Sequence, residues 1–337
     1  MNQPLPKLTL KDYASDQEVR WCPGCGDYAI LKTVQRLMPE LGAAKENQVF
    51  VSGIGCSSRF PYYMNTYGFH TIHGRAPAVA TGVKLANPDL DVWVVTGDGD
   101  GLSIGGNHML HVLRRNIDLQ ILLFNNEIYG LTKGQYSPTS EKGTRSPSSP
   151  AGSLDLPLVP CEIALGAGAT FVARSVDTDA SHLTTIVRRS YEHKGTAFVE
   201  ILQNCPIYND GVFEEVKNKK TAAARRLDVE HGKPLIFGAE KDRGIRLNTQ
   251  TLQLEVVELG GPITEADLLV HDEGNKVIAH LLCAMKGPEF PVAAGVLYSA
   301  AKPSYVADSI AQLQTLRNRG KGDLQELLNS GNTWTAS

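Results

Sequence analysis

The chain has 337 residues, 42% of them hydrophobic, and a formal net charge of −3, which fits one large domain or one domain with a smaller addition. This charge gives no electrostatic case for binding nucleic acid, and no apolar run approaches the roughly 18 residues of a membrane span. The first residues lack the basic and apolar regions of a signal peptide, so we expect a cytoplasmic protein with neither a nucleic-acid nor a membrane partner. Six cysteines are too few for a disulfide framework in a chain of this length, which leaves ligands or core thiols as their expected roles.

Apolar segments alternate with helical patterns over the first two thirds of the chain. The predicted elements are, in chain order, a helix within 19–42, a strand at 48–53, a helix at 76–86, a strand at 90–96, a helix at 105–115, and strands at 119–124 and 197–202. Continuous apolar strands that alternate with helices are typical of an α/β fold whose parallel sheet is covered on both faces.

The rest of the chain is organised differently. Residues 136–158 are rich in Ser, Thr, Pro and Gly and predict a long functional loop. The alternation weakens from about residue 218, just after Lys217 opens a polar stretch. We therefore expect one domain over residues 1–217 and a C-terminal extension over residues 218–337, which packs on that domain or on a partner subunit.

Polar residues follow two neighbouring predicted strands at the points where these strands end. Asp98 stands between Gly97 and Gly99 after one strand, and Asn126 follows the next. In parallel sheets, ligands bind at the carboxyl ends of the strands. The Asp98 carboxylate, the Asn126 side-chain carbonyl and the Ile128 backbone carbonyl offer the oxygen ligands that Mg²⁺ prefers, and the two glycines let the backbone approach phosphate groups.

Taken singly, these fragments are also compatible with an ordinary turn and a strand cap. Together, each after a buried strand, they form the fingerprint of a thiamine diphosphate site. A Rossmann dinucleotide site is the alternative, but it requires G-x-G-x-x-G, and Leu102 stands where the last glycine of that pattern belongs.

Four cysteines lie near the same predicted edge of the sheet. Cys22 and Cys25 flank a Pro-Gly turn, Cys56 follows the end of a strand, and Cys205 precedes a proline after another strand. Thiolate sets of this kind bind zinc or an iron–sulfur cluster, and a thioredoxin-type pair or an ordinary buried Cys56 are further alternatives. The neighbouring diphosphate site favours the cluster, although the cysteine run of ferredoxins is absent. The other two cysteines lie in apolar stretches and are expected in the core: Cys161 and Cys283.

The combined motifs resemble the beta subunits of 2-oxoacid:ferredoxin oxidoreductases, most closely the 2-oxoglutarate:ferredoxin type, also called 2-oxoglutarate synthase. The matching stretches are residues 21–26, 53–57, 73–76, 97–101, 128–135 and 204–206. The resemblance implies a thiamine diphosphate-binding fold that holds thiamine diphosphate, Mg²⁺ and one [4Fe-4S] cluster. It also implies a separate alpha subunit in an (αβ)₂ assembly.

The implied reaction is oxidative decarboxylation of 2-oxoglutarate, with CoA as co-substrate, to succinyl-CoA and CO₂. Electrons would pass through the cluster to ferredoxin, with either direction of the reaction open. The alternatives are the same chemistry on pyruvate, a branched-chain 2-oxoacid or indolepyruvate, a non-redox thiamine diphosphate lyase with structural zinc, and an electron-transfer or scaffold subunit.

The resemblance assigns the cofactor and metal contacts. The expected cofactor-binding residues are Gly24, Cys25, Ser57, Gly97, Asp98, Gly99, Asp100, Asn126, Ile128, Tyr129 and Gly130. The expected cluster ligands are Cys22, Cys25, Cys56 and Cys205, and the expected Mg²⁺ ligands are Asp98, Asn126 and Ile128.

Five residues are expected at the reacting end of the site. Arg59, three residues after a proposed cluster ligand, is expected to pair with the distal carboxylate of 2-oxoglutarate, with an ordinary surface arginine as the alternative. His73 is expected near the substrate rather than in a structural role. Leu131, Thr132 and Lys133 follow the metal turn, and Lys133 either meets a substrate carboxylate or cofactor phosphate or is a solvated loop residue.

Overall fold

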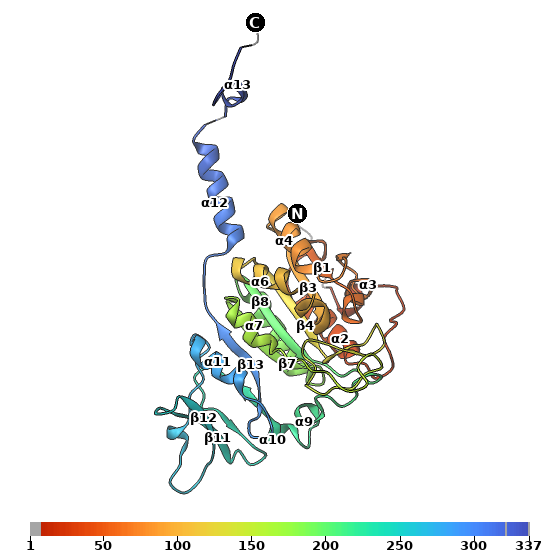
Figure 1. Cartoon of the computed structure of the whole chain (residues 1–337), viewed down its shortest axis with the longest axis vertical. Coiled ribbons are helices and arrows are strands. Elements are labelled where there is room, and N and C mark those ends of the chain that lie inside the picture. The colour runs from red at the N-terminus through yellow and green to blue at the C-terminus, as the bar shows by residue number, and fades with distance from the viewer. Residues whose placement is uncertain (1–7, 321, 336–337) are drawn as a thin grey trace, which may run out of the picture.

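The computed structural model describes residues 8–320 and 322–335, and its centre is an eight-stranded sheet (Figure 1). The spatial order of its strands is β2 (Tyr67–His70), β1 (Gln48–Ser52), β3 (Asp91–Gly97), β4 (Leu119–Asn125), β8 (Thr196–Leu202), β7 (Phe171–Val176), β13 (Val292–Ser299) and β9 (Arg226–Val229). The six strands from β2 to β7 are parallel, whereas β13 runs antiparallel to β7 and parallel to β9. The predicted α/β fold with a parallel sheet is therefore confirmed, with two reversed strands added at one edge.

Both faces of the sheet are buried, because alternate side chains of each strand enter two separate cores. On β3, Trp93 and Val95 belong to one core, and Val92 and Val94 belong to the other. The helices whose side chains enter the first core include α2 (Asp27–Leu37) and α8 (Ala180–Glu192), and those of the second include α4 (Ala76–Ala86), α6 (Gly106–Arg115), α7 (Pro160–Gly166) and α11 (Lys276–Ala284). Burial on both sides explains why these strands read as continuous apolar runs in the sequence.

The strands predicted at 48–53, 90–96, 119–124 and 197–202 are β1, β3, β4 and β8. The two helices predicted after the first two of these strands are α4 and α6. The segment around Asp98, which the two flanking glycines were expected to keep open for phosphate groups, is helical. Asp98 begins a short helix, α5 (Asp98–Leu102), directly after β3. The remaining elements of this part are α1 (Leu10–Tyr13), α3 (Phe60–Tyr63), β5 (Ile128–Tyr129), β6 (Gln135–Tyr136), and the 3₁₀ turns Met38–Leu41, Lys45–Asn47 and Ser57–Arg59.

The residues after 217 are joined closely to the rest of the chain. Strands β9 and β13 complete the main sheet, and α11 packs into one of its cores. A separate three-stranded antiparallel sheet forms beside them from β10 (Ile236–Phe237), β11 (Arg243–Asn248) and β12 (Gln253–Glu258). Short helices connect the parts: α9 (Glu214–Lys217), α10 (Ala222–Arg225) and the 3₁₀ turn Glu265–Asp267. Much of the expected extension thus packs on the first domain, while the boundary at 217 itself stays a prediction.

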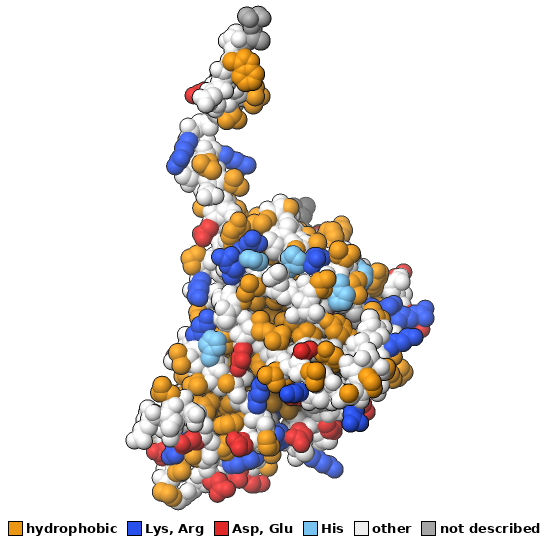
Figure 2. Space-filling model, viewed as in Figure 1, with side chains coloured by type: hydrophobic (Ala, Val, Ile, Leu, Met, Phe, Trp, Pro, Cys, Tyr) orange, Lys and Arg blue, Asp and Glu red, His pale blue; other side chains and the backbone are white. Residues whose placement is uncertain are grey.

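Helices α12 (Tyr305–Asn318) and α13 (Leu324–Leu328) form an arm that stands clear of the main body (Figures 1 and 2). Apolar side chains are exposed along it, among them Leu313, Leu324 and Trp334. No helix in the described parts of the chain combines the length and apolar character that crossing a membrane requires.

Candidate functional site

The polar residues singled out in the sequence meet at the carboxyl edge of the parallel sheet. Gly97 pairs in register with Phe124, and Asn125 pairs with Leu202. Asp98, Asn126 and the segment that leads to Cys205 therefore leave neighbouring strands at the same level, as the alternation of elements predicts.

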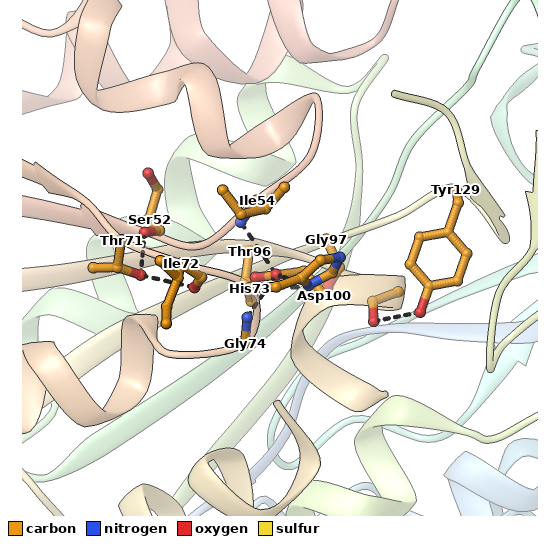
Figure 3. A network of polar contacts seen from close by, with 11 residues as sticks. Ser52, Ile54, Thr71, Ile72, His73, Gly74, Thr96, Gly97, Asp100 and Tyr129 are labelled. Carbon is orange, nitrogen blue, oxygen red and sulfur yellow. Dashed lines mark hydrogen bonds and ion pairs between the residues drawn. The ribbon is translucent and has the colours of Figure 1, made fainter. Parts of the chain in front are cut away.

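Asp100 connects three of the loops at this edge (Figure 3). Its Oδ1 accepts hydrogen bonds from the backbone N–H groups of Gly74 (2.8 Å) and Ile54 (3.1 Å), and its Oδ2 accepts one from Thr96 Oγ1 (2.8 Å). His73 Nδ1 lies 2.6 Å from Oδ1 as an ion-pair contact without good hydrogen-bond geometry. Because Asp100 is buried and each of these bonds reaches a different segment, it fixes the position of the His73 loop relative to β3.

Asp98 is buried, and residues of the long loop after β6 hold its carboxylate. Thr139 Oγ1 donates to Asp98 Oδ2 (2.6 Å) and also lies 3.1 Å from Asn125 Oδ1. Burial raises the pKa of Asp98, while hydrogen bonds from Ser137 and Thr139 oppose that shift. A buried carboxylate without a cationic partner side chain is suited to a metal cation, which supplies the missing positive charge.

The turn after Asn126 places the third expected oxygen ligand. Asn126 Oδ1 accepts a hydrogen bond from the Ile128 N–H (3.2 Å), and the hairpin of β5 and β6 follows. The Tyr129 hydroxyl donates to the Gly99 carbonyl (2.9 Å). A Cβ atom on Gly99 would stand 2.3 Å from the Tyr129 ring, so only glycine lets this hairpin close over α5.

One cavity collects most of the residues expected at the cofactor and substrate. Its lining includes thirteen of the predicted residues: Cys56, Ser57, His73, Gly97, Asp98, Gly99, Asp100, Asn126, Ile128, Tyr129, Gly130, Leu131 and Thr132. Asp27, Ile54, Gly55 and Phe124 complete the lining and were not anticipated. Asp27 could not be found from the sequence, because it sits in the first turn of a helix with no local sign of its role.

The four predicted cluster cysteines converge beside this cavity. The Sγ atoms of Cys56 and Cys205 each lie 3.6 Å from the point where a Cβ atom of Gly130 would stand. Cys25 precedes α2, and Gln203, which directly follows β8 two residues before Cys205, reaches its sulfur at 3.2 Å. The two remaining cysteines are buried in the core as expected, where Cys161 donates to the Glu200 carboxylate (3.1 Å).

Burial is the main cause of the raised pKa of Cys25 and Cys56. It raises the pKa of Cys56 to about 12 and, together with the Asp27 carboxylate, lifts that of Cys25 well above its ordinary value. Metal ligation deprotonates thiols, because the cation offsets the cost of burying their negative charge. The donor set therefore fits a bound iron centre.

A buried ion pair connects two of the cysteine loops. Asp177, directly after β7, is paired with Lys217 (Nζ–Oδ1 2.6 Å) and accepts a hydrogen bond from the Asn204 N–H (3.1 Å). A Cβ atom on Gly26 would stand 1.9 Å from Asp177 Oδ2, so the loop of Cys25 fits against Asp177 only as glycine. The position of Asp177 after a buried strand was a signal in the sequence, whereas its pairing with Lys217 was not.

Arg59 lies in a neighbouring cavity of about 450 Å³. Its Nε donates to the Tyr63 hydroxyl (3.0 Å), and the side chain is half-buried. The two cavities share Ile54, Gly55 and Leu131 in their linings. The cavity of Arg59 is therefore adjacent to the cavity that Asp98 lines.

Besides Cys22, Cys25 and Cys205, two predicted residues lie outside both linings, Lys133 and Gly24. Lys133 is exposed and adopts a left-handed φ of 77° within the turn between β5 and β6, where Thr132 donates to Gln135. Gly24 is exposed in the loop between Cys22 and Cys25, also with a positive φ. The structure thus brings His73, Leu131 and Thr132 to the site but leaves Lys133 at its rim.

No three His, Cys, Asp or Glu side chains in residues 8–320 and 322–335 converge tightly enough to bind a single metal ion. Neither proposed centre requires three such side chains on one metal ion. The proposed Mg²⁺ site uses one carboxylate beside an amide and a backbone oxygen, and the four thiolates of a cubane bind four different irons.

The fold and the site define a domain of the thiamine diphosphate enzymes. Residues 53–201 match the family model described as thiamine pyrophosphate enzyme, C-terminal TPP binding domain. The chain is 51% identical over 331 residues to a protein of Mycobacterium tuberculosis named 2-oxoglutarate oxidoreductase subunit KorB, covering 96% of this chain and 88% of that one. The chain belongs to the family of 2-oxoacid:ferredoxin oxidoreductase beta subunits. It is therefore a subunit of an oxidoreductase.

Other relatives agree with this assignment. A 2-oxoglutarate synthase subunit KorB of Methanocaldococcus jannaschii is 44% identical over 188 residues, covering 56% of this chain and 70% of that protein. A solved structure matches with a TM-score of 0.78 and 32% identity over 97% of each chain. It is a 2-oxoglutarate:ferredoxin oxidoreductase from Magnetococcus marinus with 2-oxoglutarate, coenzyme A and succinyl-CoA bound. This solved structure therefore shares the whole architecture, including the C-terminal third.

Proposed function

We propose that this chain is the beta subunit of a 2-oxoglutarate:ferredoxin oxidoreductase. The enzyme would decarboxylate 2-oxoglutarate oxidatively to succinyl-CoA and CO₂ and pass the electrons through one [4Fe-4S] cluster to ferredoxin. The observation that carries this proposal is the meeting of two sites at one sheet edge. Gly130 lines the Asp98 cavity directly after β5, and a Cβ atom added to it would stand 3.6 Å from the sulfurs of both Cys56 and Cys205.

Thiamine diphosphate, when bound, supplies the carbon nucleophile and the electron sink for decarboxylation of a 2-oxoacid. Asp98, Asn126 and the Ile128 carbonyl would hold Mg²⁺ on its diphosphate. Gly97 would leave room for the phosphates, whereas the space beside Gly99 is filled by the Tyr129 ring. Thr139 keeps the Asp98 carboxylate in place.

The cluster, when bound, supplies one-electron transfer. Cys22, Cys25, Cys56 and Cys205 would hold it, and the Asp177–Lys217 pair would fix two of their loops. Because Cys56 lines the same cavity as Asp98, electrons would travel only a short path from the thiamine diphosphate to the cluster.

Arg59, His73, Leu131, Thr132 and Lys133 are the proposed substrate contacts. Arg59 would bind the distal carboxylate of 2-oxoglutarate from the neighbouring cavity, as guanidinium groups pair well with carboxylates. His73 would meet the substrate from the loop that Asp100 holds in place. The relatives named for 2-oxoglutarate, and the related structure that holds 2-oxoglutarate and succinyl-CoA, support this choice of substrate and CoA as acceptor.

The proposed partners are an alpha subunit, in an (αβ)₂ assembly, and ferredoxin. The match to a C-terminal TPP binding domain and the naming of the relatives as subunits support an alpha subunit that supplies a second domain. Exposed apolar residues near the site support a contact there, among them Tyr67 and Phe69 on the edge strand β2 and Ile72 beyond it.

The chain should be produced anaerobically with its alpha subunit. We expect bound iron and sulfide, a visible absorbance that bleaches with dithionite, and viologen reduction that requires 2-oxoglutarate and CoA. Zinc in place of iron would reject the redox proposal, and faster turnover of pyruvate or a branched-chain 2-oxoacid would reassign the substrate.

A further inference from the structure

Gln203 is a buried polar residue between the two proposed cofactor sites. It follows β8 directly, is 1% exposed, and its N–H donates to the Asn125 carbonyl (2.8 Å) next to the proposed metal ligand Asn126. On the other side, its amide nitrogen Nε2 lies 3.2 Å from Cys25 Sγ. A Cβ atom on Gly26 would stand 2.8 Å from Gln203 Cγ, so the cysteine loop leaves space for this side chain.

The orientation of the Gln203 amide follows from its neighbours. Nε2 donates one hydrogen to the Asn204 carbonyl (2.7 Å) and has a second hydrogen for Cys25 Sγ, while Oε1 accepts no hydrogen bond from the described residues. In the reversed orientation, Oε1 would face a carbonyl oxygen and a sulfur, and both are electron-rich. The donor therefore points to the sulfur.

This N–H···S contact is distinctive within the described residues. Gln203 is the one side chain there whose N–H donates to a sulfur of Cys22, Cys25, Cys56 or Cys205. Asp27 acts in both directions, since its carboxylate charge disfavours a negative Cys25 while its backbone N–H favours one. Hydrogen bonds to cluster sulfurs are among the factors that set the reduction potential of iron–sulfur clusters.

We propose that Gln203 tunes the reduction potential of the [4Fe-4S] cluster through its hydrogen bond to Cys25. This inference rests on the proposed function. Reduction adds one electron, and hence one negative charge, to the cluster and its thiolates. An N–H dipole aimed at Cys25 Sγ stabilises the more negative state more strongly, so it raises the potential and favours electron entry from the thiamine site.

The test compares three variants in the αβ complex by anaerobic redox titration with dithionite, read by the EPR signal of the reduced cluster. Gln203→Met keeps the length of the side chain without a donor, and Gln203→Glu places an oxygen where the amide nitrogen was. Gln35→Met is the matched control, because Gln35 is also buried but donates to the Tyr63 carbonyl.

We expect Gln203→Met to lower the equilibrium constant for reduction of the cluster about tenfold. This corresponds to a downward shift of its reduction potential by about 59 mV for one electron. Gln203→Glu should shift the potential at least as far, and Gln35→Met should leave it unchanged. An unchanged potential in Gln203→Met with full iron content would overturn the proposal, as would loss of the cluster in both Gln203 variants, which indicates a structural role. Absence of any cluster in the wild-type complex would instead reject the proposed function.

Discussion

Lys217 Nζ lies 2.6 Å from Oδ1 and 2.8 Å from Oδ2 of Asp177, and both side chains are more than nine-tenths buried. The pair stands beside the loops of Cys25 and Cys205, because Asp177 also accepts from Asn204 and packs against Gly26. A buried ion pair is costly to leave with one partner. It therefore ties residues 214–217 to the sheet edge that carries the site.

Lys217→Met is expected to lower the free energy of unfolding by roughly 3–5 kcal/mol, because it leaves the Asp177 carboxylate buried and unpaired. The iron content of the purified complex should fall with it. Guanidinium unfolding and iron analysis measure both effects, with the exposed Lys219→Met as control. Unchanged stability in Lys217→Met would show that the pair contributes nothing net.

Asp98→Ala should abolish Mg²⁺-dependent binding of thiamine diphosphate and leave the fold intact. The substitution removes the one carboxylate of the proposed metal site and spares its neighbours on β3 and β4. Calorimetry of cofactor binding with and without EDTA is the measurement, and Asp89→Ala on an exposed loop is the control. Retention of the cofactor by Asp98→Ala at micromolar concentration would remove Asp98 from the metal site.

Serine substitutions should separate the ligand cysteines from the core cysteines. Cys22, Cys25, Cys56 and Cys205 are each expected to be needed for full iron content, because each thiolate would bind one iron. Cys161→Ser should keep its iron, since that thiol contacts Glu200 in the core. Iron loss in Cys161→Ser together with retention in Cys205→Ser would overturn this set.

Gly130→Ala tests the space between the sulfurs. The added methyl group would stand 3.6 Å from both Cys56 Sγ and Cys205 Sγ, which is ordinary contact, so the fold should persist. A cluster bound to both sulfurs needs that space, so the variant is expected to lose most of its iron. Gly106→Ala, where nothing lies within 4 Å, is the control. Normal iron content in Gly130→Ala would place the cluster elsewhere.

Arg59→Met is expected to raise the KM for 2-oxoglutarate by about one to two decades, because charge-assisted hydrogen bonds to a carboxylate are worth roughly 1.5–3 kcal/mol. Pyruvate, which lacks the distal carboxylate, should be turned over at the wild-type rate or faster. Viologen reduction by the complex is the assay, with the exposed Arg36→Met as control. Equal losses on both substrates would mean that Arg59 supports the fold or the cluster instead.

The sequence by itself determined four of the six parallel strands and the chemistry at their ends, but it did not show β2 or β7. Buried strands are continuous apolar runs, and residues such as Asp98 and Asn126 follow them directly, so local patterns were sufficient. The close pair Cys22 and Cys25 was visible in the same way.

Only the tertiary structure decided the contacts between distant segments. Thr139 reaches Asp98 from a polar loop, Gln203 reaches Cys25 across the sheet edge, and Lys217, which the sequence placed at a polar boundary, is buried on Asp177. Strand β13 joins the sheet antiparallel to β7, more than a hundred residues away in the chain. Such contacts depend on which surfaces the folded chain brings together, and periodicity within a segment carries no information about them.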